Sequence, residues 1–165
     1  MAITVTTAMC DSFKKEILMG SHLFKASGGH TFKLCLLKAT AAGSGTYDAG
    51  QTNYGSGSGA PSTSNVGTDE ATDTSGNSRY TAGGFTMATN ADPTISNNVA
   101  FIDWATDPSW GPDATITSYG GLLYNSTASG LAVATLAWGA DKTCTTGTFT
   151  VTLPAATSAA AILRI

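Results

Sequence analysis

The chain has 165 residues, a net charge of −3 and a charged fraction of 12%, against a usual share of about 25%. Hydrophobic residues make up 42% of it, and 19 residues are glycine. This composition excludes a coiled coil and a charge-rich disordered tail. It also excludes a nucleic-acid-binding domain of the usual kind, because only 8 residues are basic. We expect an N-terminal arm at residues 1–10 and one folded domain at residues 11–165.

The first element predicted along the chain is a short helix of about two turns. Asp11 or Ser12 can cap its start, and Gly20 is well placed to end it. Phe13 and Ile17 fall on one face, four residues apart. A helix of this length is not stable alone, so we expect it to pack on a sheet.

The remaining elements are predicted as strands separated by Gly, Asn, Pro and Ser. The glycine pair at 120–121 predicts a bend or bulge, and the formal glycosylation sequon at 125–127 predicts a hairpin turn. Helices between the strands are not indicated. The fold class is therefore predicted as mainly β, a single-domain antiparallel β-sandwich (jelly-roll-like) with one short N-terminal helix. The predicted strands are residues 31–38, 84–89, 99–104, 114–124, 131–138 (apolar enough to be central), 147–153 and 159–165.

Residues 41–78 are rich in Gly, Ser and Thr and predict a long loop. A long structureless loop in a compact domain is usually functional, disordered or ordered by a partner. Tyr47 and Tyr54 lie in this loop and are candidate partner contacts.

The three cysteines, Cys10, Cys35 and Cys144, fit neither a disulfide framework nor a zinc signature, so we expect free, buried thiols. Cys10 and Cys35 could in principle join His22 and His30 in a metal set, but their spacing matches no zinc pattern. No motif places a thiolate or hydroxyl beside a base. We predict no metal, no cofactor and no catalytic residues.

Two acidic groups could contribute to a calcium site, since calcium takes carboxylate oxygens in loops. The first contains Asp69, Glu70 and Asp73, and the second contains Asp103 and Asp107. Neither forms a full ligand array, and Asp in a loop more often forms a turn. Turns are therefore the preferred interpretation of both groups.

The tryptophans could form a platform for sugar stacking or could fill the core. Trp104 and Trp138 lie on predicted strands, which favours the core for both. Trp110 lies among prolines and glycine and is the better candidate for an exposed recognition site.

Six short motifs, spread over most of the chain, are similar to motifs of one protein family. They are Ser12–His22 (SFKKEILMGSH) with Thr31–Leu36 (TFKLCL), Tyr80–Gly84 (YTAGG), Leu122–Asn125 (LLYN), Val133–Lys142 (VATLAWGADK), Thr148–Pro154 (TFTVTLP) and Ala161–Ile165 (AILRI). Together they resemble the small virion structural proteins of tailed bacteriophages. The chain departs from the family pattern at Cys35 and in its expanded Gly/Ser loop.

The resemblance implies a non-enzymatic capsid decoration or cement protein that binds and stabilises the shell of major capsid protein. It implies a place on the capsid surface of the virion after synthesis in the host cytoplasm. It further implies a homo-oligomer, with a trimer favoured over a dimer. The thin supply of charge suits surfaces that other protein covers.

The arm at residues 1–9 could add a strand to the sheet of a neighbouring subunit. Nucleic acid is not an expected partner, because few residues are basic. A membrane is not an expected partner either, because the apolar runs are shorter than the roughly 20 residues of a membrane span and no signal peptide is visible. The alternative function is a tail or fibre-associated module that binds host-surface carbohydrate through loop 41–65 and Trp110. The candidate partner-contact residues are Ile3, Val5, Lys14, Lys15, Tyr47, Tyr54 and Trp110.

Overall fold

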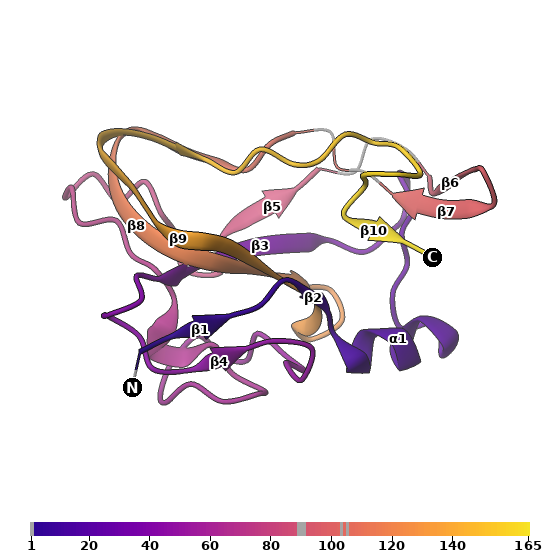
Figure 1. Cartoon of the computed structure of the whole chain (residues 1–165), viewed down its shortest axis with the longest axis horizontal. Coiled ribbons are helices and arrows are strands. Elements are labelled where there is room, and N and C mark those ends of the chain that lie inside the picture. The colour runs from indigo at the N-terminus through magenta and orange to yellow at the C-terminus, as the bar shows by residue number, and fades with distance from the viewer. Residues whose placement is uncertain (1, 89–91, 103, 105) are drawn as a thin grey trace.

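The computed structural model describes residues 2–88, 92–102, 104 and 106–165. The fold is mainly β with antiparallel sheets and one short α-helix, as predicted at that level (Figure 1). The described elements are β1 (Thr4–Val5), β2 (Ala8–Met9), α1 (Asp11–Leu18), β3 (Phe32–Lys38), β4 (Thr46–Tyr47), the 3₁₀ helix η1 (Gly67–Asp69), β5 (Phe85–Met87), β6 (Thr94–Ser96), β7 (Val99–Ile102), β8 (Ser109–Asn125), β9 (Leu131–Thr150) and β10 (Leu163–Arg164).

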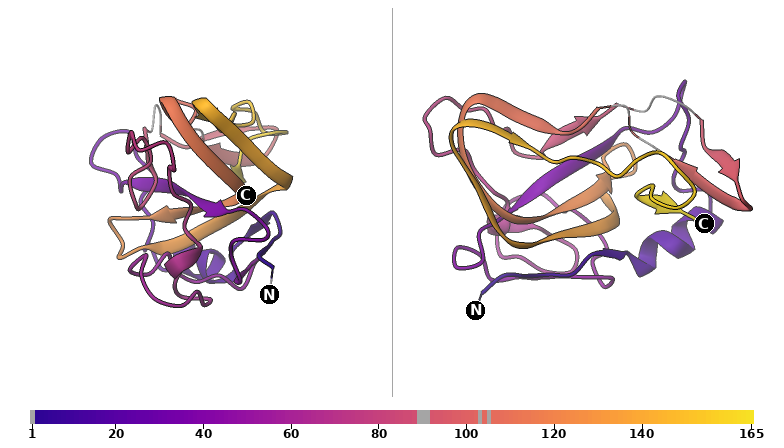
Figure 2. Two further views of the ribbon diagram at one scale, coloured as in Figure 1. Left: turned by 90° about the vertical axis from the view of Figure 1, so that its left-hand side faces the viewer. Right: turned by 45° about the horizontal axis from the view of Figure 1, so that its top comes forward.

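The largest sheet has five strands in the order β2-β9-β8-β3-β5. Strands β8 and β9 form a long antiparallel hairpin that bends back on itself (Figures 1 and 2). The strand register shifts between Ser118 and Gly120, which confirms the predicted bulge. A Cβ at Gly120 would lie 2.6 Å from the Leu136 carbonyl oxygen, so the bend requires glycine there. The predicted turn at 125–127 is also confirmed, because it joins β8 to β9.

Strand β3 is the centre of the core. It lies between β8 and β5, and the side chains of Phe32, Leu34 and Leu36 are fully buried on one face. Cys35 and Leu37 alternate with them and are buried on the other face. Burial of both faces explains why this segment is apolar almost throughout.

The remaining strands form a three-stranded antiparallel sheet, β10-β7-β6, and a parallel pair, β1-β4. The pair β1-β4 contains the first strand of the predicted arm, and β2 pairs with β9. Ile3 and Val5 are buried in the core of their own chain. The expectation of a free arm is therefore wrong for residues 3–9, since their backbone and apolar side chains already have partners within the chain.

Helix α1 begins and ends close to the predicted bounds. Its N-cap residue is Cys10, whose backbone is extended and makes no side-chain cap bond, rather than Asp11 or Ser12. Gly20 follows the helix with a φ of +71°, a left-handed conformation that glycine adopts without strain. Phe13 is buried under the helix, as its spacing predicts.

The strand predictions differ from the structure in several places. The predicted strands 131–138 and 147–153 belong to one 20-residue strand, β9, which continues through the polar residues between them. Strand β6 was not predicted, although it pairs with β7 through a turn at Asn97 and Asn98, both of which have positive φ. Of residues 159–165, only Leu163–Arg164 form a strand.

The Gly/Ser/Thr-rich segment at 41–78 contains β4 and η1 and carries its own hydrogen bonds. For example, the Asn65 side-chain amide donates to the carbonyl oxygens of Ser58 and Ala60. The Val66 amide donates to the Tyr54 carbonyl oxygen at 2.8 Å. The segment is therefore ordered by short polar side chains rather than by regular secondary structure.

Candidate assembly surface

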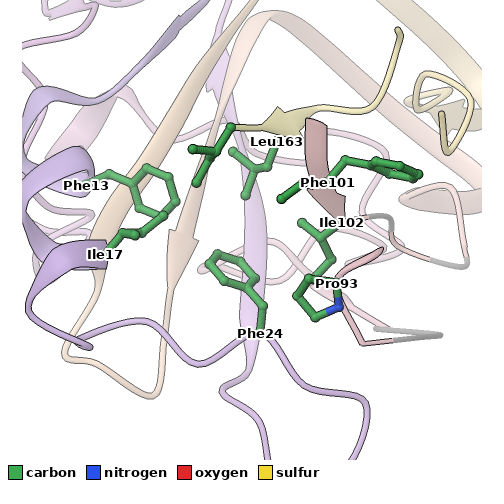
Figure 3. Close-up of a pocket in the computed structure, with 9 residues that line it drawn as sticks. Phe13, Ile17, Phe24, Pro93, Phe101, Ile102 and Leu163 are labelled. Carbon is green, nitrogen blue, oxygen red and sulfur yellow. The ribbon is translucent and has the colours of Figure 1, made fainter. Parts of the chain in front are cut away.

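An apolar pocket lies between α1, the segment that follows it, β7 and β10. Phe13 and Ile17 reach it from α1, and Phe24 and Leu163 face them from the other elements (Figure 3). The pocket has a volume of about 90 Å³, roughly that of a few water molecules. Its complete lining is Phe13, Ile17, Phe24, Pro93, Ala100, Phe101, Ile102, Leu163 and Ile165.

Five large apolar residues are exposed on α1, on the segment that follows it, on β6 and at Ile165. Leu18 is 88% exposed and Met19 is 67% exposed at the end of α1, and Leu23 precedes the pocket residue Phe24. Ile95 of β6 is 78% exposed and is the register partner of Ala100, which lines the pocket. Ile165, itself in the lining, is 71% exposed. We call the pocket and these five side chains the apolar end.

Figure 1 shows that α1, β6, β7 and β10 all lie at the same end of the molecule. In the described part of the chain, no other large hydrophobic residue is strongly exposed. Single exposed apolar residues are normal on a protein surface, whereas large contiguous apolar patches mark interaction sites. Covering one fully exposed Leu or Ile with protein contributes about 1.5–3 kcal/mol to association.

The wall of the pocket rests on packed aromatic rings. Phe24 stacks on Phe32 with ring centroids 4.4 Å apart, and Trp104 meets both rings edge to face. Phe13 approaches Phe24 with a centroid distance of 6.1 Å. These contacts join the segment after α1 to the central strand β3, so the pocket is attached to the main core.

A chain of polar side chains lies beside these rings. The His22 side chain is fully buried, and its Nε2 lies 2.9 Å from Glu16 Oε2 on α1. Asn125 Nδ2, at the end of β8, lies 3.0 Å from His22 Nδ1 and 2.9 Å from His30 Nδ1. Burial lowers the pKa of His22, while the Glu16 carboxylate opposes that shift. The sequence had singled out both histidines, but it offered Asn125 only as a turn residue.

A second polar cluster lies on the other side of β3. The buried Glu70 carboxylate accepts hydrogen bonds from the Tyr54 hydroxyl (2.6 Å), the Tyr80 hydroxyl (2.8 Å) and the Gly83 amide (2.6 Å). The Tyr80 hydroxyl also accepts from the Leu36 amide. These hydrogen bonds attach the 41–84 region to the core. They also give both oxygens of the Glu70 carboxylate a donor within the chain.

Asp69 and Asp73 also accept hydrogen bonds from groups of the same chain. Asp69 accepts hydrogen bonds from the amides of Ser44 and Gly45 and from the Tyr47 hydroxyl. Asp73 accepts from three backbone amides, among them that of Thr115 at 2.8 Å. In the described part of the chain no three His, Cys, Asp or Glu side chains gather as a metal site requires. Asp103 of the second acidic group lies outside the described residues, and Asp107 accepts from the Leu153 amide.

The cysteines are free, as predicted. Cys10 and Cys35 are buried, whereas Cys144 is only partly buried. Burial raises the pKa of Cys10 to about 12 and that of Cys35 well above its usual range, so both are protonated thiols at neutral pH.

Among the candidate partner contacts, Lys14 and Lys15 are exposed on α1, next to the apolar end. Lys14 Nζ lies 2.7 Å from Asp11 Oδ1. The loop tyrosines contact the chain itself: the Tyr47 hydroxyl donates to Asp69, and the Tyr54 ring stacks on Tyr124 with centroids 4.4 Å apart.

The expectation that Trp110 is exposed is wrong. Its residue is 4% exposed, because β8 begins at Ser109 and carries the ring into the core. The ring packs against Tyr80, Phe85 and Phe149 at centroid distances of 5.6–6.2 Å. It therefore presents no free face to a sugar. The residues with the largest exposed apolar surface, Leu18 and Ile95, were absent from the sequence-based candidates.

No family model, no curated protein and no solved structure matches the chain. None of the helices in the described residues is long and apolar enough to cross a membrane.

Proposed function

We propose that the protein is a non-enzymatic subunit of a phage virion that decorates or cements the capsid, and that it binds the major capsid protein through the apolar end. The observation that carries this proposal is the group of exposed side chains around an apolar pocket. Leu18, Met19, Ile95 and Ile165 are each at least two-thirds exposed. A partner surface that covers them removes apolar area from water, which drives most protein association.

Three further features support the proposal. The motifs at 12–22, 80–84 and 148–154, among others, resemble those of small virion proteins. The low charge fraction of 12% means that little charge must be desolvated when other protein covers the surface. Lys14 and Lys15 lie beside the apolar end, where they would favour an acidic rim on the partner.

The finer fold assignment, a β-sandwich of jelly-roll type, belongs to the same proposal. It is supported by the antiparallel sheets β2-β9-β8-β3-β5 and β10-β7-β6. A homo-oligomer, with a trimer preferred, is part of it as well, since decoration subunits that meet a symmetric shell repeat its symmetry.

The test is a cryo-EM reconstruction of the virion of the encoding phage, combined with binding of the purified chain to shells of its major capsid protein. The chain should occupy the head shell with the apolar end against the shell. Leu18→Asp and Ile95→Asp should each weaken binding by about tenfold to a hundredfold, because each removes about 1.5–3 kcal/mol of burial.

Thr63→Asp is the matched control, because Thr63 is exposed in the 41–78 segment, far in sequence from the apolar end. It adds the same charge and should leave binding unchanged. Location on the tail, or equal binding by the Leu18, Ile95 and Thr63 variants, would overturn the proposal.

A further inference from the structure

The segment between α1 and β3, residues 21–31, is held at its base by an unusual arrangement of one asparagine and two histidines. Asn125 Nδ2 lies within 3.0 Å of Nδ1 of both His22 and His30. An amide nitrogen carries two hydrogens and no acceptor, so it can serve both rings only if each Nδ1 is unprotonated.

The orientation of the Asn125 amide is fixed by the backbone. Its Oδ1 accepts a hydrogen bond from the Ala128 amide at 3.1 Å in the turn between β8 and β9. A flipped amide would place Nδ2 against the Ala128 N–H, donor against donor. The Nδ2 group must therefore face the two histidines.

The other nitrogen of His22 is also occupied. Nε2 lies 2.9 Å from Glu16 Oε2, so the neutral ring carries its proton on Nε2 and donates it to the carboxylate. Among the described residues, Glu16 of α1 and His30 of the segment are the ionisable groups that act on His22. The other neighbours of its ring are the uncharged Phe13, Phe24 and Phe32.

We infer that Asn125, His22 and His30 form a pH-sensitive latch, which holds residues 21–31 closed when both imidazoles are neutral and releases them when the rings are protonated. A proton on either Nδ1 faces an Asn125 N–H, so the hydrogen bond is lost and two donors oppose each other. Burial and a positive His30 also disfavour the positive ring of His22, whereas the Glu16 carboxylate favours it.

Besides the latch, the segment is attached by the Phe24 ring, which stacks on Phe32, and by hydrogen bonds from the Ser126 amide and hydroxyl to the Thr31 carbonyl oxygen. The His30 amide donates to the Leu23 carbonyl oxygen within the segment, the Ala26 amide to Asp92, and the Thr31 amide to the Thr127 hydroxyl. Phe24 of this segment lines the pocket of the apolar end. Release therefore also alters the apolar end, and only this last consequence rests on the proposed function.

Hydrogen–deuterium exchange of the isolated chain tests the latch without any partner. Rates are corrected for the intrinsic effect of pH. We expect the protection of the His30 and Thr31 amides to fall about fivefold between pH 7.5 and pH 5, as loss of a net hydrogen bond of about 1 kcal/mol implies. Amides in the centre of β8 should keep their protection over the same range.

Asn125→Asp provides the sharpest comparison, because it is isosteric and keeps the acceptor for Ala128. Its second oxygen would accept hydrogen bonds from the protonated Nδ1 atoms of both imidazoles, so protection of residues 21–31 should hold or rise as the pH falls. Asn97→Asp, at an exposed residue whose side chain contacts Ser158, adds the same charge and should behave as wild type.

His30→Asn supplies a second variant that does not titrate but keeps an acceptor near the position of Nδ1. It should reduce the pH dependence of protection. Unchanged protection of the wild-type segment at pH 5, or the same loss in Asn125→Asp as in wild type, would overturn the inference. If Asn125→Asp does not fold, an unreduced pH dependence in His30→Asn would overturn it alone.

Discussion

The Glu70 carboxylate gives the strongest test of how the 41–84 region is held. Its Oε1 accepts from the Tyr80 hydroxyl and the Gly83 amide, and its Oε2 accepts from the Tyr54 hydroxyl. Glu70→Ala removes all three acceptor contacts and leaves the donors in a region where Glu70 is only 7% exposed. A hydrogen bond to a charged group contributes about 1.5–3 kcal/mol, and each buried donor left without a partner costs about 1–3 kcal/mol.

We therefore expect Glu70→Ala to lower the free energy of unfolding by about 3–5 kcal/mol, with a fall in Tm of roughly 10 °C. Urea unfolding followed by tryptophan fluorescence measures this directly. Glu70→Gln keeps the shape and one carbonyl oxygen, and the Tyr54 hydroxyl can rotate to accept from its amide. Its loss should be about 1–2 kcal/mol.

A double-mutant cycle with Tyr54→Phe isolates one of the three bonds. The Tyr54 hydroxyl lies 2.6 Å from Glu70 Oε2, so the coupling energy should be about 1–2 kcal/mol. If Glu70→Ala costs less than about 1 kcal/mol, or if the two substitutions are additive, the carboxylate does not hold this region as argued.

The remaining predictions concern titratable groups. At about pH 8, iodoacetamide should label Cys144 well before Cys10 and Cys35 in the folded protein, because Cys10 and Cys35 are buried, protonated thiols. Mass spectrometry of the peptides measures the labelling rates. Equal rates for the three cysteines would contradict this prediction. Hydrogen bonds from the Thr115, Ser75 and Arg79 amides lower the pKa of Asp73, so its contribution to stability is present above its ordinary pKa of 3.8 and is lost as the pH falls below that value. The difference in Tm between wild type and Asp73→Asn should therefore be widest above about pH 5 and should shrink toward pH 2; a constant difference would refute this assignment.

The sequence predicted elements whose signals are local. Helix α1 has a helical apolar spacing and a glycine after its last turn. Strand β3 is a short apolar run with turn residues on either side. The bulge at Gly120 was predictable for the same reason, since a glycine pair within a long apolar strand has few other roles. These predictions depend on neighbours in sequence alone.

Strand β9 and the 41–78 segment were not predictable in this way. Residues 139–147 are polar with two glycines and look like a loop, but β8 supplies a partner strand along this stretch. The 41–78 segment is ordered by contacts such as Asp69 with Ser44 and Gly45, which depend on the folded path of the chain. Tertiary pairing overrides local propensity in both cases.

The apolar end was missed for a related reason. Leu18 follows Ile17 directly, and composition alone does not tell which of the two faces solvent. Ile95 lies on β6, which was not predicted as a strand. Trp110 was misplaced because the prolines and glycine around it indicate a turn, whereas the structure carries its ring into the core.

The pairing of the N-terminal strands with distant partners affects the order in which the chain can fold. Strand β2 pairs with β9, and Thr135 donates to the carbonyl oxygen of Thr6 across 129 residues. During synthesis Thr6 emerges 129 residues before Thr135, so this hydrogen bond must wait for β9. Such long-range closure slows folding, and strand β2 is without its partner β9 throughout that interval.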